Sequence, residues 1–354
     1  MEPIDWTLAQ RVAARVGGTD EFAKSYLAHS LEADFAELTE QAEQLVGEST
    51  GLHSTSGKAR AKVVSRPDWV AVNLASFKRQ LAPLTERMSK QMSGVLAPPA
   101  RAVAGAEIGT LLGWMSQRVL GQYDLLVSED NPDEGDTVYY VGSNVLAIEK
   151  RHAFPPREFR LWLALHEVTH RAQFTGVPWM REHYLNLVKV TMGSMEPDPK
   201  RFVEALKRAV SEVRAGHNPI ADGGIVALLA GNEQRAAMDE IAGMMSLLEG
   251  HGDVTMNRAG RGHVPSADRF ARVLSQRRGE VKGVAKIVRT LLGVEAKMRQ
   301  YEEGEKFIAH VENVRGERFI DHAWAGSKSL PTLAEIRNPD GWIDRVGRVG
   351  AVAR

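Results

Sequence analysis

The sequence predicts an α+β fold that is predominantly helical, with one small strand or hairpin element. Apolar residues recur at helical spacing along most of the chain. A stretch rich in Val, Tyr and Ile at 137–151 follows a turn-forming cluster at 131–136 and is interrupted by Gly-Ser-Asn. The length of 354 residues is sufficient for a large hydrophobic core. These patterns predict helices packed around a small sheet.

The N-terminal region, residues 1–135, is predicted to be mainly helical. The segment 47–62, which reads GESTGLHSTSGKARAK, concentrates Gly, Ser and Thr without apolar periodicity, so we expect an exposed, mobile loop there. Apolar periodicity predicts helices near 5–16, 20–46, 67–94 and 99–121.

Three glycines repeat every four residues in the last of these helices, at Gly105, Gly109 and Gly113. Residues four apart share one helix face, so this stripe would allow a neighbouring helix to approach closely. The stretch has no continuous apolar span, which argues against dimerisation within a membrane.

The second predicted region, residues 136–354, contains the hairpin and a series of helices separated by turns with Gly and Pro. Its last stretch, LPTLAEIRNPDGWIDRVG at 330–347, predicts a short helix, a turn and a terminal helix. We expect the two regions to form one compact unit.

Composition limits the possible chemistry. Lys plus Arg and Asp plus Glu both number 45, so a zero formal net charge gives no overall attraction to nucleic acid or anionic lipid. The chain has no cysteine, which excludes disulfides, thiolate nucleophiles and cysteine-bound metals. Glu2 and Asp5 stand where a secretory signal would carry basic residues and an apolar run. We therefore expect a cytoplasmic protein without a membrane or nucleic-acid partner.

The pentapeptide His-Glu-Val-Thr-His at 166–170 is the strongest chemical signal. On a helix, His166 and His170 lie on one face and can direct two ring nitrogens at one metal ion. Glu167 is displaced by about 100° from His166, which places its carboxylate beside the metal as a proton acceptor. The spacing therefore predicts a zinc site with Glu167 as the catalytic base.

The flanking residues support a helix through this motif. Pro156 suits a first helical turn, while Gly176 and Pro178 follow the apolar run as a stop signal. The alternative is a chance match, in which the two histidines are hydrogen-bonded core residues. Since the helix is strongly apolar, its buried imidazoles and carboxylate each need a partner or a metal, and we favour the metal.

A catalytic zinc needs a third protein ligand from elsewhere in the chain. The metzincin extension is excluded because Gln173 stands where that motif requires Gly. Glu249 extends an apolar helical stripe and can face inward, and Asp253 four residues later could orient a zinc-bound histidine. His251 is the rival ligand, and the cluster Glu-Gly-His-Gly could also be a plain surface turn that ends a helix.

The chain also resembles a known family, the bacterial, largely actinobacterial, zincin-like metallohydrolases labelled for an association with deazaflavin-coenzyme biosynthesis. The resemblance covers most of residues 100–345 and implies a zincin-like metallopeptidase fold. It implies zinc on His166 and His170, with Glu167 catalytic and Glu249 as the third ligand. The label establishes no coenzyme, and we predict none. The matching stretches are AEIGTLLGWMSQRVLGQYD, LALHEVTHRAQFTGVPWMREHY, LLEGHGDVTM, KMRQYEEGEKFI and LPTLAEIRNPDGWIDRVG.

The predicted function is a gluzincin-like, zinc-dependent metallohydrolase, most simply a peptidase or related amide hydrolase that uses a metal-activated water. His251, Tyr184 and His183 are candidate donors to the transition state. The strand element at 137–149 is the expected partner for an extended substrate. The alternative is a catalytically silent zincin-like module that binds or regulates another molecule. The sequence determines neither the substrate nor the oligomeric state.

Overall fold

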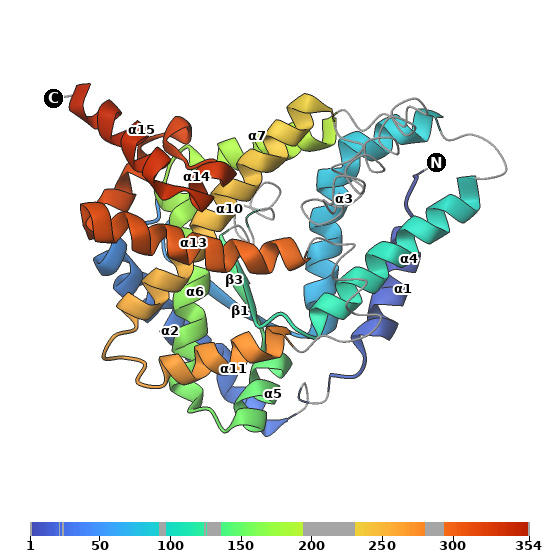
Figure 1. Ribbon diagram of the computed structural model, residues 1–354. Coiled ribbons are helices and arrows are strands. Elements are labelled where there is room, and N and C mark those ends of the chain that lie inside the picture. Colours follow the sequence, from blue (N-terminus) through green and yellow to red (C-terminus); the bar gives the residue numbers. More distant parts are fainter. Residues whose placement is uncertain are drawn as a thin grey trace. The chain divides into compact units, whose positions relative to one another are not determined.

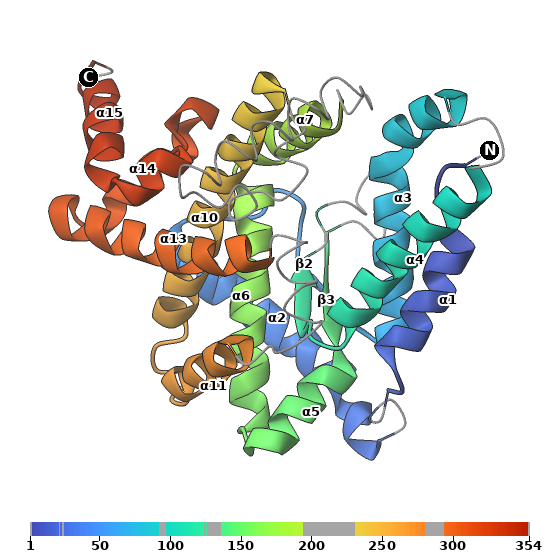
Figure 2. The same ribbon diagram turned by 45° about the vertical axis from the view of Figure 1, so that its right-hand side comes forward.

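The computed structural model describes residues 2–20, 22, 25–91, 97–123, 125, 136–193, 231–279 and 294–352. Helices dominate and one three-stranded sheet accompanies them (Figures 1 and 2), so the predicted α+β fold is confirmed. The chain divides into two compact units: unit 1 comprises 1–176 and 255–274, and unit 2 comprises 177–254 and 275–354. The predicted division after residue 135 stays a prediction.

Unit 1 contains the sheet and the helices that cover it. In chain order its elements are α1 (Trp6–Gly17), η1 (Tyr26–Ser30), α2 (Leu31–Thr50), β1 (Arg60–Val64), α3 (Arg66–Gln91), α4 (Ala97–Ser116), β2 (Gly121–Tyr123), β3 (Thr137–Val141), α5 (Gly142–His152) and α6 (Pro156–Gly176). It also contains most of α11 (Ala267–Gly279) and the last residues of α10 (Asn232–Ala259).

The sheet has β3 at its centre, with β1 parallel on one side and β2 antiparallel on the other. All five residues of β3 are buried, and successive side chains of a strand point to opposite faces. Val138 and Tyr140 belong to a core with α2, α5 and α6, whereas Tyr139 and Val141 belong to a core with α1, α3 and α4. Figures 1 and 2 show these helices on the two sides of the sheet.

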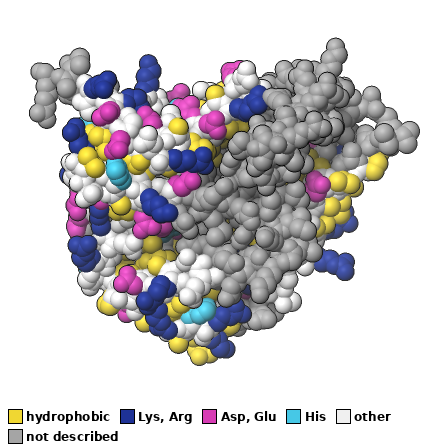
Figure 3. Space-filling view, in the orientation of Figure 1, with side chains coloured by type: hydrophobic (Ala, Val, Ile, Leu, Met, Phe, Trp, Pro, Cys, Tyr) yellow, Lys and Arg dark blue, Asp and Glu magenta, His cyan; other side chains and the backbone are white. Residues whose placement is uncertain are grey.

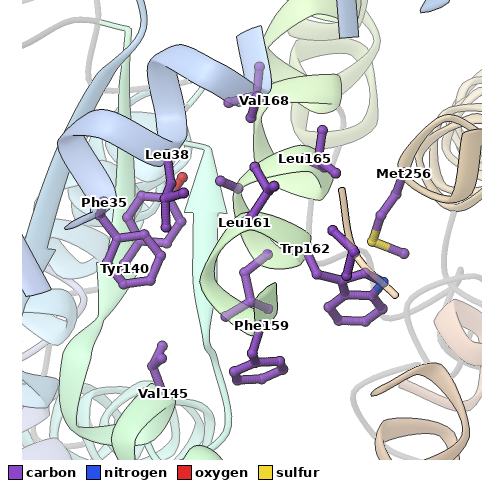
Figure 4. Packing of buried hydrophobic residues seen from close by; sticks show 14 of the residues in the cluster. Phe35, Leu38, Tyr140, Val145, Phe159, Leu161, Trp162, Leu165, Val168 and Met256 are labelled. Carbon is purple, nitrogen blue, oxygen red and sulfur yellow. The ribbon is translucent and has the colours of Figure 1, made fainter. Parts of the chain in front are cut away.

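The larger core packs α6 against the sheet and α2. The rings of Phe35 and Tyr140 stack with centroids 3.8 Å apart, and the Tyr140 hydroxyl hydrogen-bonds the Thr39 hydroxyl at 2.8 Å. Figure 4 shows Leu161 and Leu165 of α6 within this cluster. The apolar face of α6 is therefore fixed by side chains that surround it in unit 1.

Three local predictions in unit 1 are wrong. Residues 60–62, the end of the predicted loop, belong to β1, because their partner is β3, far away in the sequence. The second half of the predicted hairpin is the helix α5, since β3 already has a strand on each side. The predicted helix 99–121 ends at Ser116, and Gly121 begins β2. Each error concerns pairing between distant segments, which local propensity does not register.

The glycine stripe of α4 packs against α1, as predicted. A Cβ atom placed on Gly105, Gly109 or Gly113 would lie 2.3–2.6 Å from a backbone carbonyl oxygen of α1 or of Asp5, which precedes it. Such distances are sterically impossible, so glycine allows the two helix backbones to touch. Asp5 also caps α1 by accepting a hydrogen bond from the backbone N–H of Leu8 at 2.9 Å.

The regular elements of unit 2 are all helices among its described residues. The predicted C-terminal pattern is confirmed, because α14 and α15 are a short and a longer helix, and Thr332 and Glu335 form a capping box at the first. Besides most of α10, its elements are α7 (Met180–Gly193), α13 (Val294–Arg315), η3 (Glu317–Ala325), η4 (Ser327–Ser329), α14 (Leu333–Arg337) and α15 (Pro339–Val352).

The surface agrees with the balanced charge of the sequence. Figure 3 shows Lys and Arg side chains interspersed with Asp and Glu over the described part of one face. Among the described residues, no helix is both long enough and apolar enough to cross a membrane.

Candidate metal centre

Helix α6 carries the His-Glu-x-x-His motif in a regular helix, as predicted. It begins at Pro156, whose fixed φ and missing N–H suit a first turn, and it ends at Gly176. A Cβ atom on Gly176 would lie 2.9 Å from the carbonyl oxygen of His53, so this end of the helix requires glycine. Most of the helix is buried, while His166 and His170 remain half-buried.

The two histidine rings converge through their Nε2 atoms. These atoms lie 3.2 Å apart, and the rings are nearly perpendicular at 86°. Two nitrogens bound tetrahedrally to one zinc at about 2.0–2.1 Å would lie about 3.3 Å apart. The observed separation therefore matches the spacing of two nitrogen ligands of one tetrahedral zinc.

Gln173 holds the other side of the His170 ring. Its side chain is fully buried, and its Oε1 atom lies 3.0 Å from His170 Nδ1. A protonated Nδ1 donates to this oxygen, and the lone pair of the neutral ring is then on Nε2, the atom that faces His166. In the sequence analysis, Gln173 only excludes the metzincin motif. Its position three residues after His170 nevertheless makes the two side chains neighbours on a helix.

The carboxylate of Glu167 points toward β2. Its Oε2 atom accepts a hydrogen bond from the backbone N–H of Tyr123 at 3.0 Å, and the residue is 8% exposed. A Cβ atom on Gly121 would lie 2.7 Å from Glu167 Cγ and 2.8 Å from its Oε1. Glycine at 121 therefore provides the space that the carboxylate occupies. No sequence signal marks Gly121 or Tyr123, because Gly121 is the last residue of a predicted helix and Tyr123 lies just beyond it.

The sheet topology contradicts the expected substrate-pairing element. Residues 137–149 were expected in that role, but β3 is paired on both edges and α5 follows it directly. Among the described residues, β2 is the strand whose backbone meets the motif, because Tyr123 binds Glu167. The error arose because the three residues of β2 are too few to show strand periodicity.

A buried charge network supports α6 directly after His170. The guanidinium of Arg171 donates to the carboxylates of Glu43 and Asp136 and, at 2.6 Å, to the carbonyl oxygen of Gly57. Burial raises the pKa of Asp136, although its hydrogen bond with Arg171 opposes that shift. The network ties α6 to α2 and to the segments that precede β1 and β3.

Tyr140 lies in the core beneath the motif helix. Burial raises the pKa of its hydroxyl, and the negative charge of Glu167 raises it further, while the hydrogen bond with Thr39 opposes both. Tyr140 is therefore a neutral hydrogen-bonding group at ordinary pH and does not supply a charge to Glu167.

In unit 2, the candidates around residue 250 lie within the continuous helix α10, not in a surface turn. Glu249 and His251 are 3% and 5% exposed, so the surface-turn alternative is wrong. The ring of His251 packs edge-on against Trp324, with centroids 5.1 Å apart. Asp253 follows Glu249 by one turn of the same helix.

The glycine beside Glu249 has a packing role in α10. A Cβ atom on Gly250 would lie 2.3 Å from the carbonyl carbon of Gly304, and one on Gly304 would lie 1.9 Å from the carbonyl oxygen of Ser246. The backbones of α10 and α13 therefore touch at this crossing. Gly250 does not interrupt α10, because contact with α13 explains its presence.

His183 and Tyr184, the other candidate donors, lie on α7 in unit 2. His183 Nε2 is 3.1 Å from Glu240 Oε1, and its ring packs against Trp179 with centroids 5.8 Å apart. His183 also lines a cavity of about 690 Å³ in this unit, together with Trp179 and Lys189. The donor roles of His183, Tyr184 and His251 stay predictions.

Among the described residues, His166, His170 and Glu249 are the group of His and acidic side chains that could hold a metal ion. This group contains the two predicted histidine ligands and the predicted glutamate. Two imidazoles and one carboxylate are ligand types that zinc accepts, with a fourth position left for water or substrate.

Comparison with known proteins gives a family and a related structure. A family profile described as zincin-like metallopeptidase matches residues 4–343. A solved structure from Chloroflexus aurantiacus, described as a candidate hydrolase with a novel fold, is 29% identical with a TM-score of 0.73. That match covers 98% of this chain and 99% of the other. No protein with a curated description matches the chain.

Proposed function

Because the chain belongs to the zincin-like metallopeptidase family, we propose that it is a zinc-dependent hydrolase that cleaves peptides or related amides. The observation that carries this proposal is the pair of Nε2 atoms 3.2 Å apart, with the carboxylate of Glu167 held beside them by β2. The description of the Chloroflexus aurantiacus protein as a candidate hydrolase agrees with this reaction class.

In this proposal His166 and His170 bind the zinc, and Glu249 is the third ligand. The last residues of α10 belong to unit 1, where Met256 lies in the same core as Leu165 of α6 (Figure 4). Glu249 precedes Met256 by seven residues, which is two turns of the continuous helix α10 and the same face of it. This periodicity supports a carboxylate directed toward the side of α10 that meets α6.

The same periodicity disfavours His251, the rival ligand. Five residues separate His251 from Met256, so the two side chains leave α10 in directions about 140° apart. The ring of His251 already packs against Trp324. Asp253 is three residues from Met256 and four from Glu249, so it shares much of the Glu249 face. We propose that Asp253 orients His166, since Gln173 contacts His170.

A zinc ion at this site would polarise a substrate carbonyl and increase the acidity of water. Glu167 then accepts a proton from the attacking water and delivers it to the leaving amine. Its Oε2 atom receives the Tyr123 N–H, and its Oε1 atom lies over Gly121, so the carboxylate has a fixed direction before the reaction. The half-buried histidines and the buried glutamate limit water around this proton transfer.

The test is the substitution Glu167→Gln. The amide oxygen can still accept the Tyr123 N–H, but the group no longer accepts a proton. We expect stoichiometric zinc to be retained, while hydrolysis of a mixed peptide library falls by about 10²–10⁴-fold. Metal content and chelator-sensitive turnover are measured together for the wild-type protein and the variant.

The double substitution of His166 and His170 to Ala is the control, and it should abolish both zinc binding and turnover. Zinc retained at full stoichiometry in a folded double variant would contradict the metal site. Unchanged chelator-sensitive turnover in zinc-loaded Glu167→Gln protein would contradict the catalytic role. Zinc binding without turnover on any amide substrate would favour the catalytically silent module.

A further inference from the structure

We propose that Gln173 is a positioning residue that fixes the tautomer and the ring direction of His170. This inference rests on the proposed zinc site, because its consequence is measured as zinc affinity. Gln173 is fully buried one turn beyond His170, and its Oε1 atom lies 3.0 Å from His170 Nδ1. The contact therefore joins a buried amide to the ring atom opposite the one that faces His166.

The hydrogen bond selects one protonation state of the neutral imidazole. When Gln173 Oε1 accepts the Nδ1 proton, His170 Nε2 keeps a lone pair and points at His166 Nε2, 3.2 Å away. If the amide were reversed, its NH₂ group would donate to Nδ1, and the ring proton would move to Nε2. That second arrangement would block metal binding, so only the first is compatible with the site.

Burial makes this selection effective. A buried polar group that loses a hydrogen bond to a protein neighbour is destabilised unless water or another group replaces that neighbour. Water does not readily replace the ring as its partner, because Gln173 has no exposed surface. Rotation of His170 away from His166 would therefore leave both the ring and the amide without this contact. The buried amide resists such a rotation and keeps His170 directed at the metal position.

A neutral amide differs from the carboxylate that often occupies this place behind a metal-bound histidine. It orients the ring without adding a negative charge to a helix that already carries Glu167. A carboxylate at 173 would accept the same Nδ1 proton and would increase the basicity of the ring. Substitution by Glu is therefore the conservative rescue, whereas substitution by Ala removes the acceptor.

The first experiment measures zinc affinity by competition with a chromophoric chelator. We expect Gln173→Ala to bind zinc about 10- to 100-fold more weakly than wild type, and Gln173→Glu to recover most of that loss. Thr175→Val is the matched control, since Thr175 is also buried on α6 and its hydroxyl bonds the carbonyl of Arg171, not a histidine. Wild-type affinity in a folded Gln173→Ala protein would overturn the proposal.

The second experiment reads the His170 tautomer directly, from ¹⁵N chemical shifts of the metal-free wild-type protein. We expect the proton on Nδ1, and a proton on Nε2 would overturn the proposal whether or not zinc binds. A wild-type protein that fails to bind zinc would contradict the proposed function alone. This measurement needs no variant, so a misfolded Gln173→Ala protein would not prevent the test.

Discussion

Helices α6 and α10 both carry candidate ligands, but different interactions position them. On α6, helical spacing brings the two histidines onto one face, and contacts inside unit 1 then orient the His170 ring and the Glu167 carboxylate. On α10, Glu249 is one buried carboxylate in a helix of 28 residues, and its neighbour Gly250 seats that helix against α13. The first arrangement is local in the sequence, whereas the second depends on which helices touch.

We expect this difference to make the two helices sensitive to different changes. The His pair needs a regular helix and the contact of Gln173 with His170, so packing changes on α6 away from Gln173 should leave the separation of its Nε2 atoms intact. As a zinc ligand, Glu249 would require α10 to keep its rotation about the helix axis and its position along that axis. Both depend on the crossing of α10 with α13. We therefore expect zinc affinity to respond to packing on α10 as well as to Gln173, and catalysis to respond to packing beside Glu167.

The largest effect should follow Glu249→Ala. Removal of the third ligand should weaken zinc binding by more than the roughly 10- to 100-fold typical of a residue that only orients a ligand. His251→Ala should lose packing against Trp324 and change zinc affinity by less than about tenfold, since its ring neither binds the metal nor orients a ligand in this proposal. Chelator competition on both variants decides between the two residues, and a larger loss in His251→Ala would reverse the assignment.

A smaller effect, on catalysis and not on zinc, should follow Gly121→Ala. The new methyl group would lie 2.7–2.9 Å from atoms of the Glu167 side chain. It would therefore displace the carboxylate from the position that it has beside β2. A displacement of about 1 Å can cost on the order of 10²-fold in rate. Turnover should fall by about that factor while zinc stoichiometry stays unchanged. A matched Gln122→Ala variant changes the same strand without adding a group at Glu167.

The fold class and the chemistry of α6 could be predicted because both depend on short-range patterns. Pro156, Gly176 and the four-residue spacing of the histidines each act within one helix. The close approach of a helix to the glycine stripe of α4 could be predicted for the same reason. The three-residue strand β2 was not, because its strand geometry depends on pairing with β3.

The contacts of Gln173 and Gly304 show a second limit. Gln173 has a helical spacing from His170, but many glutamines share such a spacing with a histidine and make no contact. Gly304 is an isolated glycine, and Ser246, whose backbone it contacts, lies 58 positions earlier in the chain. Sequence periodicity identifies the face of a helix, whereas the identity of the facing segment requires the three-dimensional structure.

The smallest expected effect is that of Gly304→Ala on the stability of unit 2. Its Cβ atom would lie 1.9 Å from the carbonyl oxygen of Ser246, so the backbones of α10 and α13 must separate. Such overpacking costs about 1–3 kcal/mol, which is at least as large as the gain of about 1 kcal/mol from replacing a helical glycine by alanine. Faster amide hydrogen exchange in α10 and α13 should report this loss. Gly341→Ala in α15 is the control, because the nearest atom is Glu335 Cγ at 3.9 Å.

Gly109→Ala should separate α1 from α4 in unit 1 and leave zinc affinity unchanged, while Gly304→Ala should also weaken zinc binding. Equal zinc affinity in these two variants would show that the crossing with α13 does not position Glu249.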